Sequence, residues 1–334
     1  MVTVNNTPAA LKVVGILVIL WWVGAAGATQ EAVTALHVNL LVVGDWGLSP
    51  SAKRAPSRQN TAQAMAEYVL KSRIPFDAVL ACGDNCKVKL AGPDDPQFSQ
   101  AFDETYSAQA LSVPFYAVFG NHDYEYDAVA AELEHGRRHP TSRWKMPGRW
   151  YRLDLPAENP LVTVLMLDSN RTQLGKEAWQ AELHWMEEEL SRPRRSAWTI
   201  CLGHHPLFSD GQHGDDAAMQ KAWGPILKKH EVDFYISGHD HVLQQLQIPG
   251  WPTTFLTSGG GGEDTKRPVR VDRGPFVRAI HGFAALRCSP RSATVSLIDD
   301  AGTVLHAFER NRTGEIRILR TTPSNNPSAA AKTK

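Results

Sequence analysis

Five short polar motifs in this sequence carry side chains that could bind metal ions. Carboxylate, amide and imidazole groups are ligands that Fe, Zn and Mn accept, and none of the motifs offers the all-cysteine set of a structural zinc site. The candidate ligands in these motifs are Asp45, Asp84, Asn121, His204, His239 and His241. This set predicts a pair of metal ions, with one carboxylate placed between them to offset their mutual repulsion.

The order and spacing of the motifs strengthen this interpretation. A Gly-Asp pair alone is a common turn, and a single loop histidine is usually solvated. Here five motifs each deliver a metal-compatible group. His239 and His241 are two residues apart, so on an extended backbone both imidazoles lie on the same side, and one can serve each metal.

Each motif directly follows an apolar run of strand length. The runs cover Val38–Val43, Ala78–Cys82, Phe115–Phe119, Trp198–Leu202 and Phe234–Ser237. Near-continuous apolar runs are typical of strands buried on both faces. Helical spacing follows in residues 60–71, 179–190 and 217–230. Alternating strands and helices predict βαβ units, whose ligand sites lie beyond the carboxyl ends of the strands, where all five motifs fall.

The last part of the chain changes character. Residues 283–319 contain alternating segments at 293–298 and 304–308, joined by Asp299-Asp300-Ala301-Gly302, which predicts antiparallel hairpins. No linker interrupts 37–319, so we expect one catalytic domain with two similar halves. Residues 321–334 are small and polar, and we expect a disordered tail.

The N-terminus has the pattern of an export signal. Val13 to Ala26 is an apolar run preceded by Lys12, and Ala26-Gly27-Ala28 supplies small residues for cleavage. We expect residues 1–28 to be a signal peptide. The alternative is an uncleaved signal anchor, although the run is shorter than the ~18 residues of a spanning helix.

Export would expose the chain to glycosylation and oxidation. Asn170 and Asn311 lie in Asn-x-Thr sequons and are candidate glycosylation sites. Four cysteines allow three pairings, which the sequence leaves open. Cys82 and Cys201 each lie in an apolar run, where burial as a small hydrophobic residue is expected.

The charge balance excludes one class of partner. Lys and Arg total 35 and Asp and Glu total 35, with no basic patch, so we expect no nucleic-acid binding.

The ordered set GDWG, GDN, GNHD, GHHP and GHDHV resembles the metallophosphoesterases, specifically the small purple (tartrate-resistant type) acid phosphatases. The resemblance extends over most of the chain, through Leu165-Met166-Leu167-Asp168, Gly211-Gln212-His213-Gly214, Thr257-Ser258-Gly259-Gly260 and the closing hairpins. The GDWG form favours this branch. It implies an α/β fold, a β-sandwich of two mixed sheets flanked by helices and built from two similar βαβ-containing halves.

The same resemblance implies the roles of the ligands. Asp45 and His241 would hold the first metal, Asn121, His204 and His239 the second, and Asp84 would bridge them. A metal-activated hydroxide would then hydrolyse phosphate monoesters.

Two further histidines match catalytic positions of the family. His122 would contact the phosphate or protonate the leaving alkoxide, and His213 matches a second such histidine. An imidazole that acts in its protonated form, with an ordinary pKa of ~6.5, suits mildly acidic pH.

Lys87 departs from the family pattern, which has a metal-binding tyrosine three residues after the bridging aspartate. An ammonium cannot ligate a metal. We therefore expect a protein that is not purple. We also expect two metal ions per chain, Fe together with Zn, Mn or a second Fe. The absence of the tyrosine leaves the identity of the ion at the first site open. The sequence leaves two positions open for Lys87, beside the phosphate as a point charge or on a displaced, solvent-facing loop.

The remaining residues near the motifs have expected supporting roles. His205 should point away from His204 and line the wall of the site. Asp168 and Asp240 either orient imidazoles or serve as capping or turn carboxylates, and the second role is favoured. The Gly259–Gly262 run lacks the Lys-Ser/Thr pair of a phosphate-binding loop and predicts a turn bordering the site.

Two alternative functions stay open at this stage. One is a phosphodiesterase or nucleotide pyrophosphatase that uses the same centre, and the other is a catalytically impaired binding protein. The expected partners are small phosphorylated substrates, including phosphoproteins, with no stable membrane span unless the signal is uncleaved. We expect the protein to be secreted or to lie in a lumenal compartment, which includes a lysosome-like compartment. If the N-terminal signal is not cleaved, we expect it to be anchored in a membrane.

Overall fold

In the computed structural model of the chain, residues 36–47 and 55–322 are described. These described residues belong to one compact unit. The expected signal peptide, residues 1–28, lies outside the described residues, as does the expected tail from residue 323. The last strand continues to Thr321, so the first residue of the expected tail belongs to a sheet.

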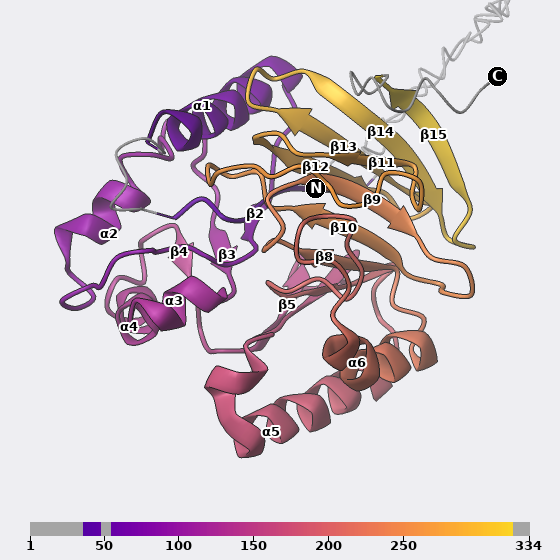
Figure 1. The fold of residues 1–334 in the computed structure, drawn as a ribbon, viewed down its shortest axis with the longest axis horizontal. Coiled ribbons are helices and arrows are strands. Elements are labelled where there is room, and N and C mark those ends of the chain that lie inside the picture. The colour runs from indigo at the N-terminus through magenta and orange to yellow at the C-terminus, as the bar shows by residue number, and fades with distance from the viewer. Residues whose placement is uncertain (1–35, 48–54, 323–334) are drawn as a thin grey trace, which may run out of the picture. The chain divides into compact units, whose positions relative to one another are not determined.

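Two mixed sheets lie face to face at the centre of this unit (Figure 1). Within the described residues, the first sheet has eight strands in the order β15-β14-β13-β12-β1-β2-β3-β4. They are β1 Val38–Val43, β2 Ala78–Ala81, β3 Phe115–Ala117, β4 Trp144–Lys145, β12 Gly282–Cys288, β13 Ser292–Asp299, β14 Val304–Asn311 and β15 Ile316–Thr321. Strands β1 to β4 are parallel, and the hairpins from β12 onward are antiparallel, as the alternating pattern predicted.

The second sheet has seven strands in the described part of the chain, in the order β11-β9-β10-β8-β7-β6-β5. They are β5 Tyr151–Leu155, β6 Val162–Met166, β7 Trp198–Leu202, β8 Phe234–Ser237, β9 Leu243–Gln247, β10 Thr254–Ser258 and β11 Phe276–Arg278. Strands β6, β7, β8 and β10 are parallel, so each sheet has a parallel half.

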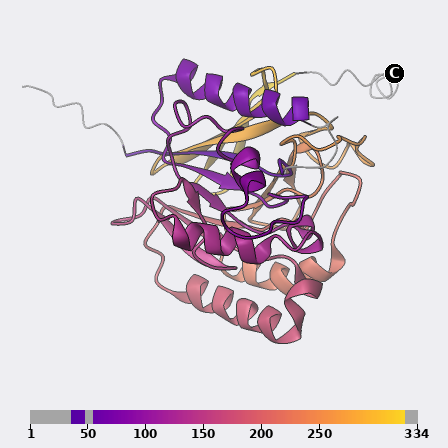
Figure 2. The ribbon, with the colours of Figure 1, turned by 90° about the vertical axis from the view of Figure 1, so that its left-hand side faces the viewer.

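Helices cover the outer faces of both sheets (Figures 1 and 2). In the described residues they are α1 Ala55–Ser72, α2 Pro96–Ala101, α3 Asn121–Glu125, α4 Val129–Arg138, α5 Arg171–Ser191 and α6 Ala217–Lys229. Helices α1, α2 and α4 pack on the first sheet through Met65, Phe98 and Val129. Helices α5 and α6 cover the second sheet, where Trp179 stacks on Trp223 with ring centroids 5.5 Å apart.

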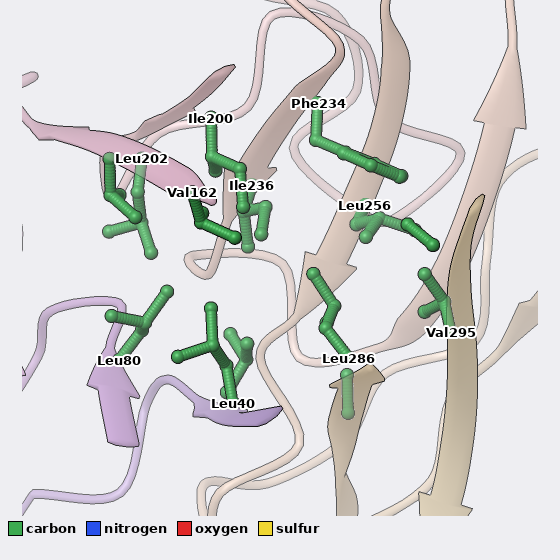
Figure 3. Close-up of a cluster of buried hydrophobic side chains, with 14 of the residues drawn as sticks. Leu40, Leu80, Val162, Ile200, Leu202, Phe234, Ile236, Leu256, Leu286 and Val295 are labelled. Atoms are coloured by element: carbon green, nitrogen blue, oxygen red, sulfur yellow. The ribbon is translucent and has the colours of Figure 1, made fainter. Parts of the chain in front are cut away.

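The main core lies between the two sheets. Leu40 and Leu80 of the first sheet face Val162, Ile200 and Leu202 of the second (Figure 3). Burial of such side chains drives the sheets together, at about 25 cal/mol per Å² of apolar surface removed from water. The apolar runs that precede the motifs are therefore the inner layer of the sandwich.

The strands and helices that the apolar periodicity predicted are present, with shifted ends. Strands β2 and β3 stop one and two residues earlier than expected, and the chain leaves β2 through Gly83, whose φ is 87°. Helix α1 begins five residues before the expected start, and α5 begins at Arg171 with a break at Gly175. The short strands β4, β5, β9 and β11 had no clear sequence signal.

The four cysteines are free and buried, which agrees with the small hydrophobic role predicted for Cys82 and Cys201. Among residues 36–47 and 55–322, no helix combines the length and the apolar character needed to cross a membrane.

Truncating a core leucine should test the importance of the layer between the sheets. Leu40 is fully buried there, so Leu40→Ala should lower the free energy of unfolding by about 2–5 kcal/mol. Leu70 on α1 is 66% exposed, so Leu70→Ala should change the free energy of unfolding by less than about 0.5 kcal/mol. Urea denaturation followed by circular dichroism measures both, and equal losses would contradict this assignment of the core.

Candidate metal centre

The carboxyl ends of parallel strands from both sheets meet at one place. The backbone N–H of Gly44, after β1, donates to Ser258 O at the end of β10 at 2.8 Å. The N–H of Asp45 donates to Gly83 O, after β2, at 3.1 Å. All five motifs therefore lie at the edge where the two sheets come together, as the strand-end argument predicted.

Four ligand atoms converge at the position that the family resemblance assigns to the second metal. His204 Nε2 and His239 Nδ1 lie 3.1 and 3.0 Å from Asn121 Oδ1 and 3.2 Å from each other. Asp84 Oδ1 lies 3.4 Å from His204 Nε2. Ligands bound at ~2.0–2.2 Å with angles between octahedral and tetrahedral stand about 3.0–3.5 Å apart. The four side chains therefore fit a metal ion.

The protonation and orientation of these imidazoles suit a ligand role. Burial, with further contributions from His205 and His204, lowers the pKa of His239 well below its usual value, which keeps the ring neutral. His204 Nδ1 lies 2.8 Å from the carbonyl oxygen of Cys82, which fixes the ring with Nε2 toward Asn121. A neutral imidazole anchored through its other nitrogen is the form that binds metal.

At the position assigned to the first metal, Asp45 and His241 lie together. His241 Nε2 is 3.5 Å from Asp45 Oδ1, and His241 Nδ1 is 2.8 Å from the carbonyl oxygen of Asp264. The other oxygen of Asp45 accepts the backbone N–H of His239 at 2.9 Å. Burial disfavours charge on His241, but its hydrogen bond to Asp45, the charge of Asp45 and its bond to the backbone of Asp264 together outweigh burial and raise its pKa.

Lys87 lies inside the centre, next to this first position. Its Nζ is 3.2 Å from Asp84 Oδ2 and 3.5 Å from Glu263 Oε2, and the side chain is 5% exposed. Burial disfavours the charge, but Asp84 and Glu263 outweigh it and raise the pKa of Lys87. The solvent-facing alternative for Lys87 is therefore wrong. The lysine remains a cation, which adds no metal ligand.

The ligand-bearing turns are tight and strained. Asp45, Asp84 and His239 have φ values of 59°, 53° and 68°, in the left-handed region that non-glycine residues rarely adopt. At Gly120 a Cβ atom would lie 2.1 Å from Asp84 Oδ1. The glycine in the third motif is therefore needed because the bridging carboxylate passes directly over it.

His122 and His213 lie near different candidate ligands, Asp84 and His239. His122 Nε2 is 3.8 Å from Asp84 Oδ2, and its Nδ1 is 2.7 Å from Glu125 Oε2. The His122 side chain is 30% exposed, so it can reach both the centre and a substrate. The ring of His213 lies 4.2 Å, centroid to centroid, from the ring of His239.

His205 does not point away from the ligands, as the sequence suggested. Its ring centroid is 5.0 Å from that of His204 and 4.5 Å from that of His239. The reason is a local anchor, since Ser169 Oγ accepts the backbone N–H groups of His204 and His205 and lies 2.8 Å from His205 Nδ1. Burial, together with the charge of His204, lowers the pKa of His205 to about 3, so it is a neutral wall of the site.

The two aspartates expected to orient imidazoles have other partners. Asp168 accepts a short hydrogen bond from the hydroxyl of Tyr124 and two bonds from Asn170. Asp240 Oδ1 accepts the backbone N–H of His213 at 2.9 Å, so it fixes the main chain of that loop. Both carboxylates accept backbone N–H groups, as expected of capping or turn carboxylates, and backbone carbonyls orient His204 and His241 instead.

Asn170 is not a glycosylation site in this fold. Its side chain is 1% exposed, and its Nδ2 donates to Phe119 O at 3.0 Å and to Asp168 Oδ1 at 2.8 Å. A glycan on Nδ2 would replace one of the two hydrogens that it donates and would have no space at this buried position. Asn311, at the end of β14, is partly exposed and stays a candidate.

Sequence reasoning missed three contributors to the site. Glu263 follows the four-glycine run, which borders the centre as predicted, with Gly261 N–H donating to Gly44 O at 2.9 Å. Its position after that run was the available signal. Glu125 and Ser169 lie near motifs, but only the folded chain shows that they contact His122 and His205.

Comparisons with known proteins agree with this geometry. The family model of the calcineurin-like phosphoesterases matches residues 38–243. Purple acid phosphatase 3 of Arabidopsis thaliana is 30% identical over 84% of this chain and 80% of its own length. Tartrate-resistant acid phosphatase type 5 of Sus scrofa is 28% identical over 85% of this chain and 89% of its own.

Solved structures share the fold. The Plasmodium protein described as GAP50, the anchor in the inner membrane complex, has a TM-score of 0.70 at 19% identity and covers 86% of this chain and 90% of its own. A purple acid phosphatase from yellow lupin (Lupinus luteus) seeds has a TM-score of 0.64 at 16% identity, covering 88% of this chain and 57% of its own.

Membership of this family implies a dinuclear metal centre, and the strand-end cluster of carboxylates, amide and imidazoles is where the candidate ligands lie. The chain therefore belongs to the calcineurin-like phosphoesterase family and is a metal-dependent phosphatase related to the purple acid phosphatases.

Proposed function

We propose that the chain hydrolyses phosphate monoesters at acidic pH. The observation that carries this proposal is the convergence of Asn121, His204 and His239 beside the partly exposed imidazole of His122. A metal ion at that position supplies Lewis-acid chemistry, polarising a phosphoryl oxygen and activating water. The similarity to acid phosphatases supports the monoester class.

The side chains around the metal ligands have distinct tasks in this proposal. His122, held by Glu125, donates a proton to the departing alkoxide, which requires a protonated ring and favours acidic pH. His213 contacts the phosphate from the other side. The neutral rings of His205 and His239 add no competing charge there.

The wider setting follows from the same family. We propose small phosphorylated substrates, phosphoproteins included, and a secreted or lumenal location for the mature chain. The donor set suits Fe paired with Zn, Mn or a second Fe.

Replacing the bridging carboxylate should remove activity. Asp84→Asn should lower kcat/KM for p-nitrophenyl phosphate by at least ~100-fold, since even residues that only orient metal ligands contribute 10–100-fold. Asp77→Asn, an exposed change just before the same strand β2, should leave activity unchanged. The wild type should prefer p-nitrophenyl phosphate to bis-p-nitrophenyl phosphate. A preference for the diester would indicate a phosphodiesterase in place of a monoesterase. No turnover of either substrate would indicate a binding protein.

The role of His122 as proton donor predicts a dependence on the leaving group. His122→Asn should lower kcat by about 10²–10⁴-fold for an alkyl phosphate, whose alkoxide needs a proton. The loss should be smaller for p-nitrophenyl phosphate, whose leaving group departs as an anion. His184→Asn is a matched control, because His184 pairs with Glu188 on the exposed face of α5. Equal losses on both substrates would argue against proton donation.

The purified protein should not be purple. Lys87 contacts Asp84 at the first position, where the family resemblance implies a ferric tyrosinate, and an ammonium produces no charge-transfer colour. Visible absorption spectra together with metal analysis measure this. An intense purple band in the iron-loaded protein would contradict the prediction.

A further inference from the structure

The two oxygens of Asp84 face different partners. Oδ1 faces the second position, 3.4 Å from His204 Nε2, and accepts the backbone N–H of His122 at 3.0 Å. Oδ2 faces Lys87 Nζ at 3.2 Å. A carboxylate that bridges two cations presents one oxygen to each. In this chain the cation beside Oδ2 is an ammonium.

The Lys87 side chain cannot easily leave this place. It is 5% exposed, and Glu263 holds its ammonium from the other side at 3.5 Å, while Glu263 itself is 2% exposed. Removing one partner from a buried ion pair leaves an uncompensated charge, which is strongly unfavourable. Lys87, Asp84 and Glu263 therefore form a fixed charged group within the centre.

We propose that the ammonium of Lys87 takes the place of the first metal, so that the protein works with one tightly bound metal ion at the Asn121, His204 and His239 position. This inference rests on the proposed phosphatase function and changes its metal count. The first position retains Asp45 and His241 but is a poor metal site, because a divalent ion there would stand within a few ångströms of a fixed like charge.

The ammonium also gives Lys87 a task toward substrate. A lysine has three N–H donors, and the two carboxylates within ion-pair distance of Lys87 Nζ, Asp84 and Glu263, need at most two of them. The third is directed to a phosphate oxygen when substrate enters between the ammonium and the metal. Lys87 thereby supplies, as a point charge, the charge neutralisation that a second metal gives in a two-metal centre.

Metal stoichiometry tests the inference on the full chain. Metal-free wild-type protein is loaded with Mn²⁺, passed over a desalting column and analysed by elemental analysis and electron paramagnetic resonance. We expect one retained ion per chain, with the hyperfine pattern of an isolated Mn²⁺. Two retained ions with a spin-coupled spectrum would overturn the inference.

The variant Lys87→Met keeps an unbranched apolar side chain that is one atom shorter and removes the charge. It should bind a second Mn²⁺ about 100-fold or more tightly than the wild type, because repulsion over a few ångströms is worth at least that factor. Added metal should also raise the Tm of this variant by more than it raises the Tm of the wild type, since the ion replaces the lost charge. Lys89→Met is the control, because Lys89 pairs with Asp127 at the surface and is 74% exposed.

The outcomes separate this inference from the proposed function. A one-ion wild type that hydrolyses p-nitrophenyl phosphate, together with a two-ion Lys87→Met variant, supports both. A two-ion active wild type removes the inference and leaves the phosphatase. A one-ion inactive wild type removes the proposed function and leaves the metal count. A Lys87→Met protein that folds, as judged by circular dichroism, but gains no second ion contradicts the inference.

Discussion

Buried carboxylates at the junction of the two sheets constrain the rest of the site. Asp45, Asp84 and Glu263 are each 2% exposed or less, and a charge removed from water is costly unless partners compensate it. The partners come from every side. The N–H groups of His239 and His122 donate to Asp45 and Asp84, and Lys87 joins Asp84 to Glu263. The candidate ligand atoms are thus held in place by the protein itself, which is the preorganisation that catalysis at a polar centre requires.

The sheets make this cluster possible, and the turns that bear it are strained as a result. Parallel strands of both sheets end at the same edge, so their last residues are forced close together. Asp45, Asp84 and His239 adopt left-handed φ angles directly after a glycine, a conformation that costs of order 1–3 kcal/mol each. The core between the sheets stabilises these turns. Leu40 of the first sheet and Leu202 of the second pack within this one buried cluster. Stability of the sandwich and geometry of the centre are therefore coupled.

Local sequence signals predicted much of this arrangement. Apolar runs of strand length and the motifs that follow them depend on neighbours in the chain, so β1, β7 and β8 were predicted at their observed positions. Side-chain direction depends on contacts between distant segments, which no local pattern records. His205 turns toward the ligands because Ser169 of another loop holds it, and Asn170 is buried because it reaches Phe119 O. The contact that gives Glu263 its role is of the same kind, since its partner Lys87 belongs to the other half of the fold, and the sequence offered only its position after the glycine run.

Lys87 shows how one side chain can change the charge demand of a whole centre. The phenolate that the family resemblance implies at this position would add one negative charge to the buried carboxylates and would require metal charge to neutralise it. The ammonium adds one positive charge instead. The two side chains thus differ by two unit charges, the charge of one divalent ion. A buried ammonium would be unfavourable on its own, but Glu263 lies on its far side and Asp84 on its near side. The pair of carboxylates therefore makes Lys87 tolerable, and Lys87 makes a second metal unnecessary.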